Sequence, residues 1–266
     1  MQHFWGIDLG GSKMHLEAEA LDLRWKTGIK FGPKNLQVAL REALSQAPTP
    51  PTAIGLSIPG LVKDSDEVVA TDVLPELNGL KAAELDLGIP LYFIHDLKAA
   101  THQTLALYPE TKLPVCVMVG TGIAMGWATQ GQVQIGAHGW AGEMGSMVME
   151  SGPQYRNLDQ LAAGAGILRQ WQGDVLSLAK ALGNADLDAV DLIKQAGSMM
   201  GRGLSHLIHL YNPDLILCGG GTLQYSGYVD AMLESARACT LPPMWEACKI
   251  KIAAQDANLV GKGAAQ

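Results

Sequence analysis

Residues 4–13 of the chain are Phe4-Trp5-Gly6-Ile7-Asp8-Leu9-Gly10-Gly11-Ser12-Lys13. This apolar run reaches a carboxylate, Asp8, and then turns over two consecutive glycines. The residues that follow, 14–20, alternate apolar with polar side chains, which is the period of a half-buried strand rather than of a helix. We therefore predict a β-hairpin with the glycines in its turn.

A glycine turn inside a hairpin differs from the P-loop and from the dinucleotide fingerprint, because both of those need a helix directly after the glycines. Glycine still lets successive backbone N–H groups converge on one anion, so such a turn can bind phosphate. Asp8 would face the same place and could hold a magnesium ion or a bridging water. The structural alternative is a tight hairpin that needs glycine only for positive φ angles.

At 266 residues the chain is long enough for two domains and a large core. Charged residues are only 17%, yet no apolar run approaches the roughly 20 residues of a membrane helix, so we expect a globular protein that does not span a membrane. The N-terminus lacks the basic region of a signal peptide, which favours a cytoplasmic location. A net charge of −7 without a cluster of Lys and Arg argues against nucleic-acid binding. The four cysteines lack CxxC spacing, and Cys116 and Cys218 lie in apolar, strand-like runs, so we expect reduced, buried thiols there.

The first half of the chain alternates strands with helices. We predict a helix over 35–45, a strand over 53–58 that ends at Pro59-Gly60, a helical segment over 79–87, a strand over 89–94 and a helix over 97–107. His95-Asp96 follows the second of these strands directly. Open α/β sheets place their ligand-binding groups just beyond the carboxyl ends of strands, so Asp96 is a candidate functional residue.

Beyond Pro114 the opening pattern starts again. An apolar strand over 115–119 leads into Gly120-Thr121-Gly122, and a second strand over 123–128 follows. This coarse internal repeat predicts an N-terminal lobe over 1–113 and a C-terminal lobe over 114–266, each with a phosphate-binding turn on its wall of a cleft.

The rest of the second lobe supplies further glycine-rich segments. Residues 136–145 form a glycine-dense loop that contains Glu143, and a buried strand over 214–218 ends at Gly219-Gly220-Gly221. We predict helices over 158–169, 175–182, 189–211 and 229–239 and a strand over 250–253. The glycines at 197, 201 and 203 indicate close packing of the long helix.

Taken in order, these motifs resemble the ROK family of sugar kinases and repressors, which belongs to the larger actin-like ATPase and hexokinase group. The motifs are residues 8–13, 57–60, His95-Asp96, 120–123, 141–145, and 212–214 with 219–221. The resemblance covers the chain nearly end to end, and the sequence is similar to glucokinase-, fructokinase- and N-acetylhexosamine kinase-like members of the family. It implies an α/β, two-lobed actin-like ATPase (ribonuclease H-like) fold, in which each lobe is a mixed sheet flanked by helices and the lobes enclose an interlobe cleft.

The resemblance also implies a role for each motif. Asp96 matches the general base toward a sugar hydroxyl, and Asp8 matches the residue near the metal and the γ-phosphate. The implied first phosphate loop is Gly10, Gly11, Ser12 and Lys13, and the implied second loop is Gly120, Thr121 and Gly122. The implied adenosine wall is Gly219, Gly220 and Gly221. The implied sugar-binding residues are Gly60, His95, Glu143 and Asp159.

Some residues depart from the family pattern. His95 stands where the family usually has Asn, Asp159 where members with a structural zinc site have Glu, and Ser146 where they have His. The Cys-rich segment of those members is also missing, so we expect no zinc site. Residues 261–266 match only the start of the family's final helix. Structural alternatives remain for three residues: Glu143 as an ordinary loop carboxylate, His95 as a structural residue, and Lys13 as a solvated hairpin residue.

Phosphoryl transfer needs phosphates held, charge neutralised, and an alcohol placed in line with its proton accepted. The sequence therefore predicts an enzyme that uses ATP and Mg²⁺ to phosphorylate a hexose or N-acetylhexosamine hydroxyl, with Asp96 as base. The resemblance suggests a homodimer through the second lobe. The alternative is a catalytically weak or inactive sugar-binding or regulatory protein, as the departures suggest. A DNA-binding repressor is disfavoured, because such members carry a helix-turn-helix before the first hairpin and only seven residues precede Asp8.

Overall fold

The computed structural model describes residues 3–18, 21–150, 155–254 and 257–266. Contacts divide the chain into two compact units. The first comprises Met1–Leu107, Val133–Ala141 and Asn258–Gln266, and the second comprises Tyr108–Gln132 and Gly142–Ala257. The internal repeat predicts a C-terminal lobe over 114–266, whereas Val133–Ala141 and Asn258–Gln266 group with the first unit by their contacts.

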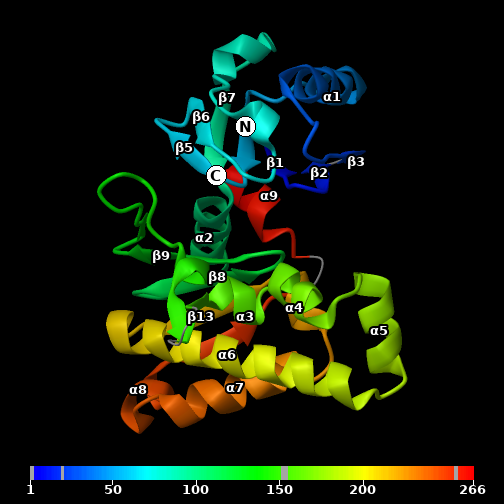
Figure 1. Ribbon diagram of the computed structural model, residues 1–266. Helices are drawn as coiled ribbons and strands as arrows, with labels where there is room; N and C mark the ends of the chain where they lie inside the picture. Colours follow the sequence, from blue (N-terminus) through cyan, green and yellow to red (C-terminus); the bar gives the residue numbers. More distant parts are fainter. Residues whose placement is uncertain (1–2, 19–20, 151–154, 255–256) are drawn as a thin grey trace. The chain divides into compact units, whose positions relative to one another are not determined.

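The first unit is built on a five-stranded sheet in the order β3-β2-β1-β4-β7 (Figure 1). The strands are β1 (Phe4–Leu9), β2 (Lys13–Ala18), β3 (Leu21–Lys26), β4 (Ala53–Ile58) and β7 (Leu91–His95). β2 pairs antiparallel with β1, which confirms the predicted hairpin, although residues 19 and 20 of the predicted strand lie outside the described residues. β1, β4 and β7 run parallel, so their carboxyl ends meet at one edge of the sheet.

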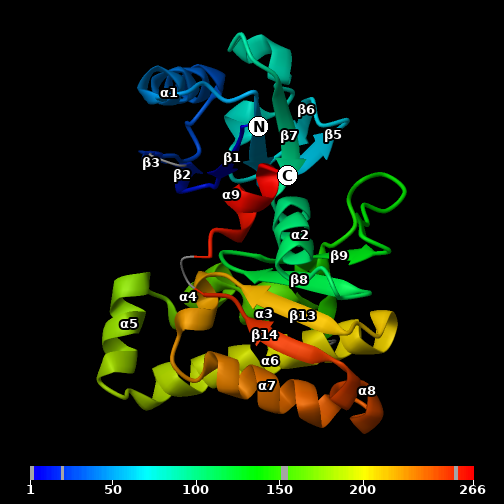
Figure 2. The same ribbon diagram turned by 180° about the vertical axis from the view of Figure 1, so that it is seen from behind.

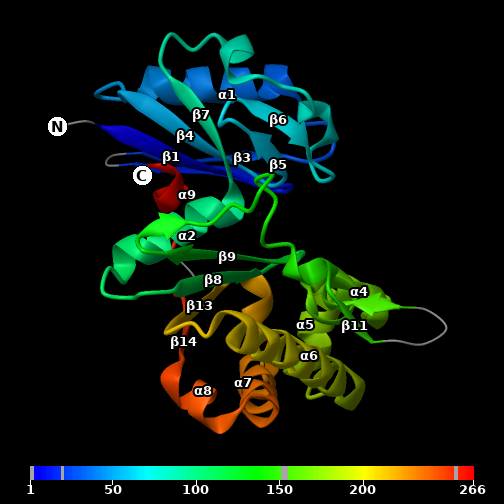
Figure 3. The ribbon, with the colours of Figure 1, turned by 90° about the vertical axis from the view of Figure 1, so that its left-hand side faces the viewer.

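Helices cover the two faces of this sheet (Figure 3). On one face, Trp5, Ile7 and Leu9 are buried in a core with residues of helix α1 (Pro33–Gln46). On the other face, helix α9 (Leu259–Ala264) approaches so closely that a Cβ at Gly6 would lie 1.8 Å from the carbonyl oxygen of Gly261. Side chains alternate between the two sides of a strand, so one side of β1 packs on the side chains of α1, and the other side, at Gly6, packs on the backbone of α9.

Helix α9 is also in backbone contact with helix α2 (Asp96–Leu107). A Cβ at Gly55 would lie 1.7 Å from the carbonyl oxygen of Ala264, and a Cβ at Gly263 would lie 1.7 Å from that of Ala99. Glycine is needed at each of these positions because no side chain fits between the backbones. These contacts set the spacing between the sheet, α9 and the helix that begins at Asp96. The first unit is completed by β5 (Leu61–Lys63), β6 (Glu67–Ala70) and the short 3-10 helices η1 (Pro75–Leu77) and η2 (Ala82–Leu85).

The second unit repeats this sheet with the order β10-β9-β8-β13-β14. The strands are β8 (Pro114–Val119), β9 (Ile123–Thr129), β10 (Gln132–Val133), β13 (Leu215–Gly219) and β14 (Lys249–Ile252). β9 pairs antiparallel with β8, and β13 and β14 follow in parallel. The two sheets therefore match strand for strand, which confirms the internal repeat predicted from the sequence.

Helices α6 and α7 lie side by side in the second unit (Figure 2). Cβ atoms at Gly197 and Gly201 of α6 would each lie 2.3 Å from a carbonyl oxygen of α7, which confirms the close packing predicted for the long helix. The helices and smaller elements of this unit are α3 (Leu158–Ala162), α4 (Gly164–Trp171), α5 (Val175–Gly183), α6 (Leu187–Tyr211), α7 (Tyr228–Cys239), α8 (Pro242–Ala247), β11 (Val148–Glu150), β12 (Arg156–Asn157), η3 (Met144–Ser146) and η4 (Gly221–Gln224).

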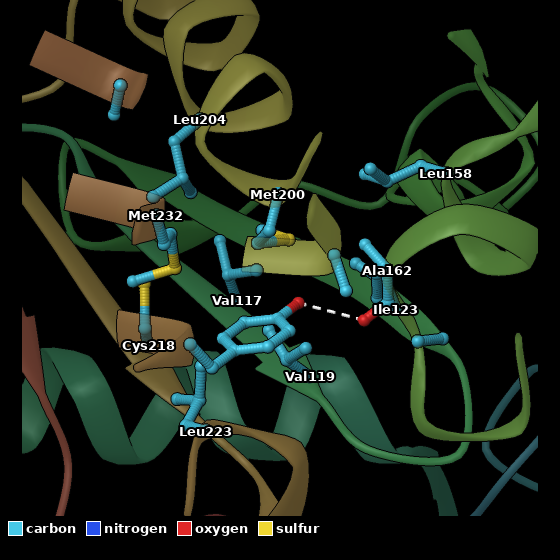
Figure 4. Packing of buried hydrophobic residues seen from close by; sticks show 14 of the residues in the cluster. Val117, Val119, Ile123, Leu158, Ala162, Met200, Leu204, Cys218, Leu223 and Met232 are labelled. Carbon is cyan, nitrogen blue, oxygen red and sulfur yellow. Dashed lines mark hydrogen bonds between the residues drawn. The ribbon is translucent and has the colours of Figure 1, made fainter. Parts of the chain in front are cut away.

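The core of the second unit joins β8 to these helices (Figure 4). Val117 and Val119 of β8 are buried in one cluster with Met200 of α6 and Met232 of α7. The buried hydroxyl of Tyr228 donates a hydrogen bond of 2.8 Å to the carbonyl oxygen of Ala162 at the end of α3. This bond satisfies a polar group that would otherwise be costly to bury.

Two predicted helices differ from the structure. Residues 79–87 contain only the 3-10 helix η2, and the predicted helix 158–169 is divided into α3 and α4 at Ala163, whose backbone is extended. The division has a physical cause, since the amides of Gly164 and Ala165 donate to the carbonyl oxygens of Gly120 and Thr121 instead of continuing α3. None of the described helices combines the length and the apolar character that crossing a membrane requires.

Candidate functional site

The first group of candidate residues lies at the carboxyl ends of β1, β4 and β7. Asp8 is in β1, Ser57 is its register partner in β4, and His95 ends β7 directly before Asp96. We call Asp8, Ser57, His95 and Asp96 the acidic edge. The structure therefore brings Asp8 and Asp96 to the same edge of one sheet.

Ser57 holds Asp8 in place. Its hydroxyl accepts a hydrogen bond from the Leu9 amide at 3.2 Å and donates one to Oδ1 of Asp8, also at 3.2 Å, and the serine is fully buried. Ser57 belongs to the motif at residues 57–60, but the sequence alone indicates no role for it. Finding that role would have required the pairing of β1 with β4, which places residues 8 and 57 side by side on one face.

His95 and Asp96 share one backbone donor. The Leu97 amide donates to Oδ1 of Asp96 at 2.7 Å and to Nδ1 of His95 at 3.2 Å, and these two acceptors are 3.1 Å apart. A proton on either atom would turn this contact into a hydrogen bond. The imidazole therefore belongs to the immediate surroundings of Asp96.

Burial raises the pKa of Asp96 to about 7, and the negative charge of Asp8 contributes to the increase, while the hydrogen bond from the Leu97 amide acts in the opposite direction. Nearby carboxylates disfavour each other's ionised forms, and a carboxyl group that titrates near neutral pH can accept a proton efficiently. The side chain keeps 29% of its exposure, so it remains accessible to a ligand. The arrangement suits proton abstraction.

The first glycine turn follows Asp8 directly. The Gly10 amide closes the turn by donating to the carbonyl oxygen of Lys13 at 2.8 Å, and the Thr27 hydroxyl donates to the carbonyl oxygen of Gly10 at 2.6 Å. Among the described residues, the amides of Gly11 and Ser12 donate no hydrogen bond to the protein. Two consecutive amides are thus available to a ligand, as an anion-binding turn requires.

Gly60 has a packing role in the structure. A Cβ at this position would lie 2.3 Å from the carbonyl oxygen of Ala70 and 2.7 Å from Cβ of Thr71, at the end of the β5–β6 hairpin. The Thr71 hydroxyl also donates to the carbonyl oxygen of Pro59 at 2.8 Å. Glycine at position 60 lets this hairpin close on the end of β4, whether or not Gly60 also contacts a sugar.

The second glycine turn lies in the second unit and is held by its carbonyl groups. The carbonyl oxygen of Gly120 accepts hydrogen bonds from the Gly164 amide and the Thr222 hydroxyl, both at 2.8 Å. The Gly120 amide closes the turn onto the carbonyl oxygen of Gly122 at 2.9 Å. Within the part of the chain that the structure covers, the amides of Thr121 and Gly122 donate no hydrogen bond to the protein. This turn therefore offers the same pair of donors as the first.

The run Gly219-Gly220-Gly221 lies against this second turn. Gly220 has a φ of +112°, and a Cβ there would lie 2.3 Å from the carbonyl oxygen of Val119. Both the backbone conformation and the close approach require glycine. The structure therefore brings the predicted second phosphate loop and the predicted adenosine wall together within one unit.

Glu143 and Asp159 have different surroundings. Glu143 is exposed and precedes the buried Met144, after Gly142, which has a φ of +118° and lies against the carbonyl oxygen of Met125. Asp159 is half-buried, and its Oδ1 accepts a hydrogen bond of 2.7 Å from the Ile123 amide. Burial raises the pKa of Asp159, while the Ile123 hydrogen bond acts in the opposite direction.

Asp8 fits the role of a magnesium ligand. Magnesium retains several waters in proteins and needs only one or two carboxylates besides the phosphates of a substrate. Within the described ranges, no three His, Cys, Asp or Glu side chains gather into a complete metal cage. Asp8 meets the smaller requirement, since Ser57 fixes one of its oxygens. Burial raises the pKa of Asp8, opposed by the Ser57 hydrogen bond and the charges of Lys13 and His15, and a bound cation would favour the ionised form.

Similarity to known proteins extends over the whole chain. The sequence pattern of the ROK family matches residues 4–265. A putative xylose repressor from Caldicellulosiruptor sp. (strain Rt8B.4) is 26% identical, over 87% of this chain and 68% of its own length. A ROK hexokinase from Thermus thermophilus is 26% identical with a TM-score of 0.79, covering 98% of this chain and 95% of its own. A ROK family glucokinase from Streptomyces griseus, solved with glucose and AMPPNP, is 20% identical with a TM-score of 0.80, covering 99% and 98%. The chain therefore belongs to the ROK family and has the actin-like ATPase fold of its sugar kinases.

Proposed function

We propose that the protein is a kinase that transfers the γ-phosphoryl group of ATP to a hydroxyl of a hexose or an N-acetylhexosamine. The observation that carries the proposal is the acidic edge, where Asp96 and Asp8 lie at the carboxyl ends of parallel strands of one sheet, Asp8 acts electrostatically on Asp96, and the first glycine turn follows β1. The ROK hexokinase and the AMPPNP-bound glucokinase that share the fold support it.

Asp96 acts as the general base in this proposal. Its carboxylate, oriented by the Leu97 amide, accepts the proton of the sugar hydroxyl while the hydroxyl oxygen forms its bond to the γ-phosphorus and ADP leaves. A base with a pKa of about 7 is partly ionised at neutral pH and still basic enough to take the proton.

In the same proposal, the two glycine turns hold the nucleotide. The amides of Gly11 and Ser12, and those of Thr121 and Gly122, donate to phosphate oxygens, and Lys13 adds a positive charge. Gly219, Gly220 and Gly221 contribute backbone against the adenosine. Mg²⁺, when bound beside Asp8, neutralises phosphate charge.

Sugar recognition falls to His95, Glu143 and the backbone at Gly60. An ionised glutamate can accept hydrogen bonds from two neighbouring hydroxyls, which suits a polyol. His95 adds a ring that can donate or accept one bond at a time. We also propose a homodimer through the second unit, which sedimentation velocity would test by giving twice the mass of one chain.

A sugar-binding regulatory protein is the second candidate. The contact between His95 and Asp96 favours it, because a proton held between Nδ1 and Oδ1 would weaken the base. The similarity to a putative xylose repressor points the same way.

A coupled assay for ADP release against hexoses and N-acetylhexosamines separates the two candidates. We expect turnover with at least one sugar, and Asp96→Asn should lower kcat by about 10²–10⁴-fold, because the base is lost while the shape is kept. Calorimetry provides the control, since the variant should bind that sugar as tightly as the wild type. Sugar binding without ADP release by the wild type would support the regulatory protein.

A further inference from the structure

We propose that Asp159 is a positioning residue that holds the second glycine turn in its phosphate-binding shape, and that it does not bind the sugar. The inference rests on the proposed function, because it assumes that this turn binds nucleotide phosphates. It replaces the sugar-binding role that the family resemblance implies for this position.

The first support is the hydrogen bond at the exit of the turn. Oδ1 of Asp159 accepts from the Ile123 amide at 2.7 Å, so the carboxylate fixes the backbone directly after Gly122. A hydrogen bond from an amide to a carboxylate is stronger than one between neutral groups. The Ile123 amide is consequently committed to the protein, which leaves the amides of Thr121 and Gly122 to the ligand.

The second support is the space around the carboxylate. A Cβ at Gly145 would lie 2.3 Å from Oδ1 of Asp159 and 2.5 Å from its Cγ, and a Cβ at Gly122 would lie 3.6 Å from Oδ1. The carboxyl group therefore occupies the volume that Gly145 leaves open, and it lies within ordinary van der Waals distance of a Cβ at Gly122. One side chain joins the turn at 120–123 to the segment at 143–146, which carries Glu143.

The third support is the rigid backbone that carries Asp159. Asp159 lies in the first turn of α3, behind the N-cap residue Asn157. The side chain of Asn157 accepts from the Gln160 amide at 2.9 Å, and the side chain of Gln160 accepts from the Asn157 amide at 3.0 Å. This reciprocal capping fixes the backbone that carries Asp159, so its short side chain has little freedom.

The length of the side chain is also explained. A glutamate would place its carboxylate farther from the backbone by one carbon–carbon bond, about 1.5 Å. With Gly145 already this close, a longer side chain could not keep the bond to Ile123 without moving the turn. An aspartate at position 159 is therefore matched to the gap between the turn and Gly145.

The experiment compares Asp159→Asn, Asp159→Ala and Asp159→Glu. Asparagine keeps an acceptor of the same length, so we expect the KM for ATP to stay within about twofold of wild type. Alanine removes the acceptor and should raise the KM for ATP by about tenfold or more, with the KM for the sugar unchanged. Glutamate should resemble alanine, which keeps the comparison available if Asp159→Ala does not fold. A raised sugar KM in Asp159→Asn with an unchanged ATP KM would overturn the proposal.

A second readout does not depend on turnover. Amide exchange at Ile123 should be slow in the wild type and in Asp159→Asn, and faster in Asp159→Ala. Equal protection of Ile123 in all three proteins would refute the positioning role. If the wild type shows no kinase activity, the proposed function fails, whereas exchange at Ile123 together with calorimetry of ADP still decides this inference.

Asp174→Ala provides the matched control. Oδ1 of Asp174 also accepts from a backbone amide at 2.7 Å, that of Ser177, but it does so at the N-terminus of α5. Losing this cap should lower stability without changing the KM for ATP. A rise in the ATP KM of the control equal to that of Asp159→Ala would show that general loosening of the second unit, and not the turn, explains the effect.

Discussion

The two units have sheets of the same strand order but carry different residue types at the strand ends. β1, the first glycine turn and β2 correspond to β8, the second glycine turn and β9, and two parallel strands follow in each sheet. In both turns the first glycine amide closes the turn, and the next two amides donate to no atom of the described protein. The strand ends differ, because those of the first unit carry Asp8, Ser57 and Asp96, whereas β13 of the second ends in glycines.

The difference shows that strand order fixes where a ligand group can lie, while the residue types at the strand ends decide its chemistry. The first unit supplies carboxylates, and a buried serine orients one of them. The second unit supplies main-chain donors, and side chains such as Thr222 and Asp159 hold that main chain in place. We therefore expect substitutions at the carboxylate-bearing strand ends of the first unit to change proton transfer, and substitutions around the second glycine turn to change nucleotide affinity.

Gly263→Ala should have the largest effect, because it forces apart the backbones that support the acidic edge. The new Cβ would lie 1.7 Å from the carbonyl oxygen of Ala99, three residues after Asp96 in α2. Backbone cannot yield as a flexible side chain does, so we expect a loss of about 3 kcal/mol or more in the free energy of unfolding. Urea denaturation followed by circular dichroism measures this loss.

Gly183→Ala is the control for Gly263→Ala in the other unit. A Cβ at Gly183, in the last turn of α5, would meet no atom within 4 Å. Alanine favours a helix over glycine, so this variant should be as stable as wild type or more stable by about 0.5–1 kcal/mol. Equal destabilisation by both substitutions would mean that the contact between α9 and α2 is not what supports the first unit.

The pH dependence of activity should report the ionisation of the carboxylates of the first unit. Asp96 must be ionised to accept a proton, and burial raises its pKa to about 7, with Asp8 contributing. The value of kcat/KM should therefore rise with pH up to about 7 and fall about tenfold for each pH unit below it. A profile that stays flat down to pH 5 would show that Asp96 does not limit the reaction.

The raised pKa of Asp96 should also make the stability of the protein depend on pH. A carboxyl group with a raised pKa contributes stability that is lost as the pH rises through its folded-state pKa. The wild type should therefore lose stability relative to Asp96→Asn as the pH rises from the ordinary carboxyl pKa of 3.8 to about 7, and it should lose no more above that. Thermal unfolding of both proteins between pH 5 and pH 9 measures this difference without any substrate.

Much of this architecture could be predicted because it depends on local patterns. Alternating residues after the first glycines predicted the hairpin, and the glycines of α6 predicted its close packing. The break between α3 and α4 could not be predicted, because the amides of Gly164 and Ala165 bond to a turn some forty residues away in the chain. Local periodicity contains no record of such a distant partner.

The candidate site divides in the same way. Asp8 and Asp96 could be found because each stands at the end of an apolar run, which marks a sheet edge. The roles of Ser57 and Asp159 could not, because each depends on which element lies next to it in space. Residues that bind a ligand leave motifs in the sequence, whereas residues that orient them need the strand register or a distant contact.

Ser57→Ala should have the smallest effect of these substitutions and gives the finest test of the comparison. It removes the hydroxyl that donates to Asp8 and leaves the Leu9 amide without its acceptor. Without this donor the pKa of Asp8 should rise further, so its negative charge and its effect on the pKa of Asp96 should both decrease. The rising limb of kcat/KM should move to lower pH, and kcat/KM at pH 8 should fall by about tenfold or less.

Ser205→Ala is the matched substitution in the second unit, where a buried serine hydroxyl donates to the carbonyl oxygen of Cys239 at 2.8 Å. Both variants lose one buried hydroxyl, so both should lose about 1 kcal/mol of stability. Only Ser57→Ala should shift the pH profile and raise the Mg²⁺ concentration needed for half-maximal activity, because only Ser57 contacts a carboxylate at a strand end. If the two variants gave the same pH profile and the same Mg²⁺ dependence, Ser57 would be a packing residue, and the chemical difference between the two units would rest on Asp8 and Asp96 alone.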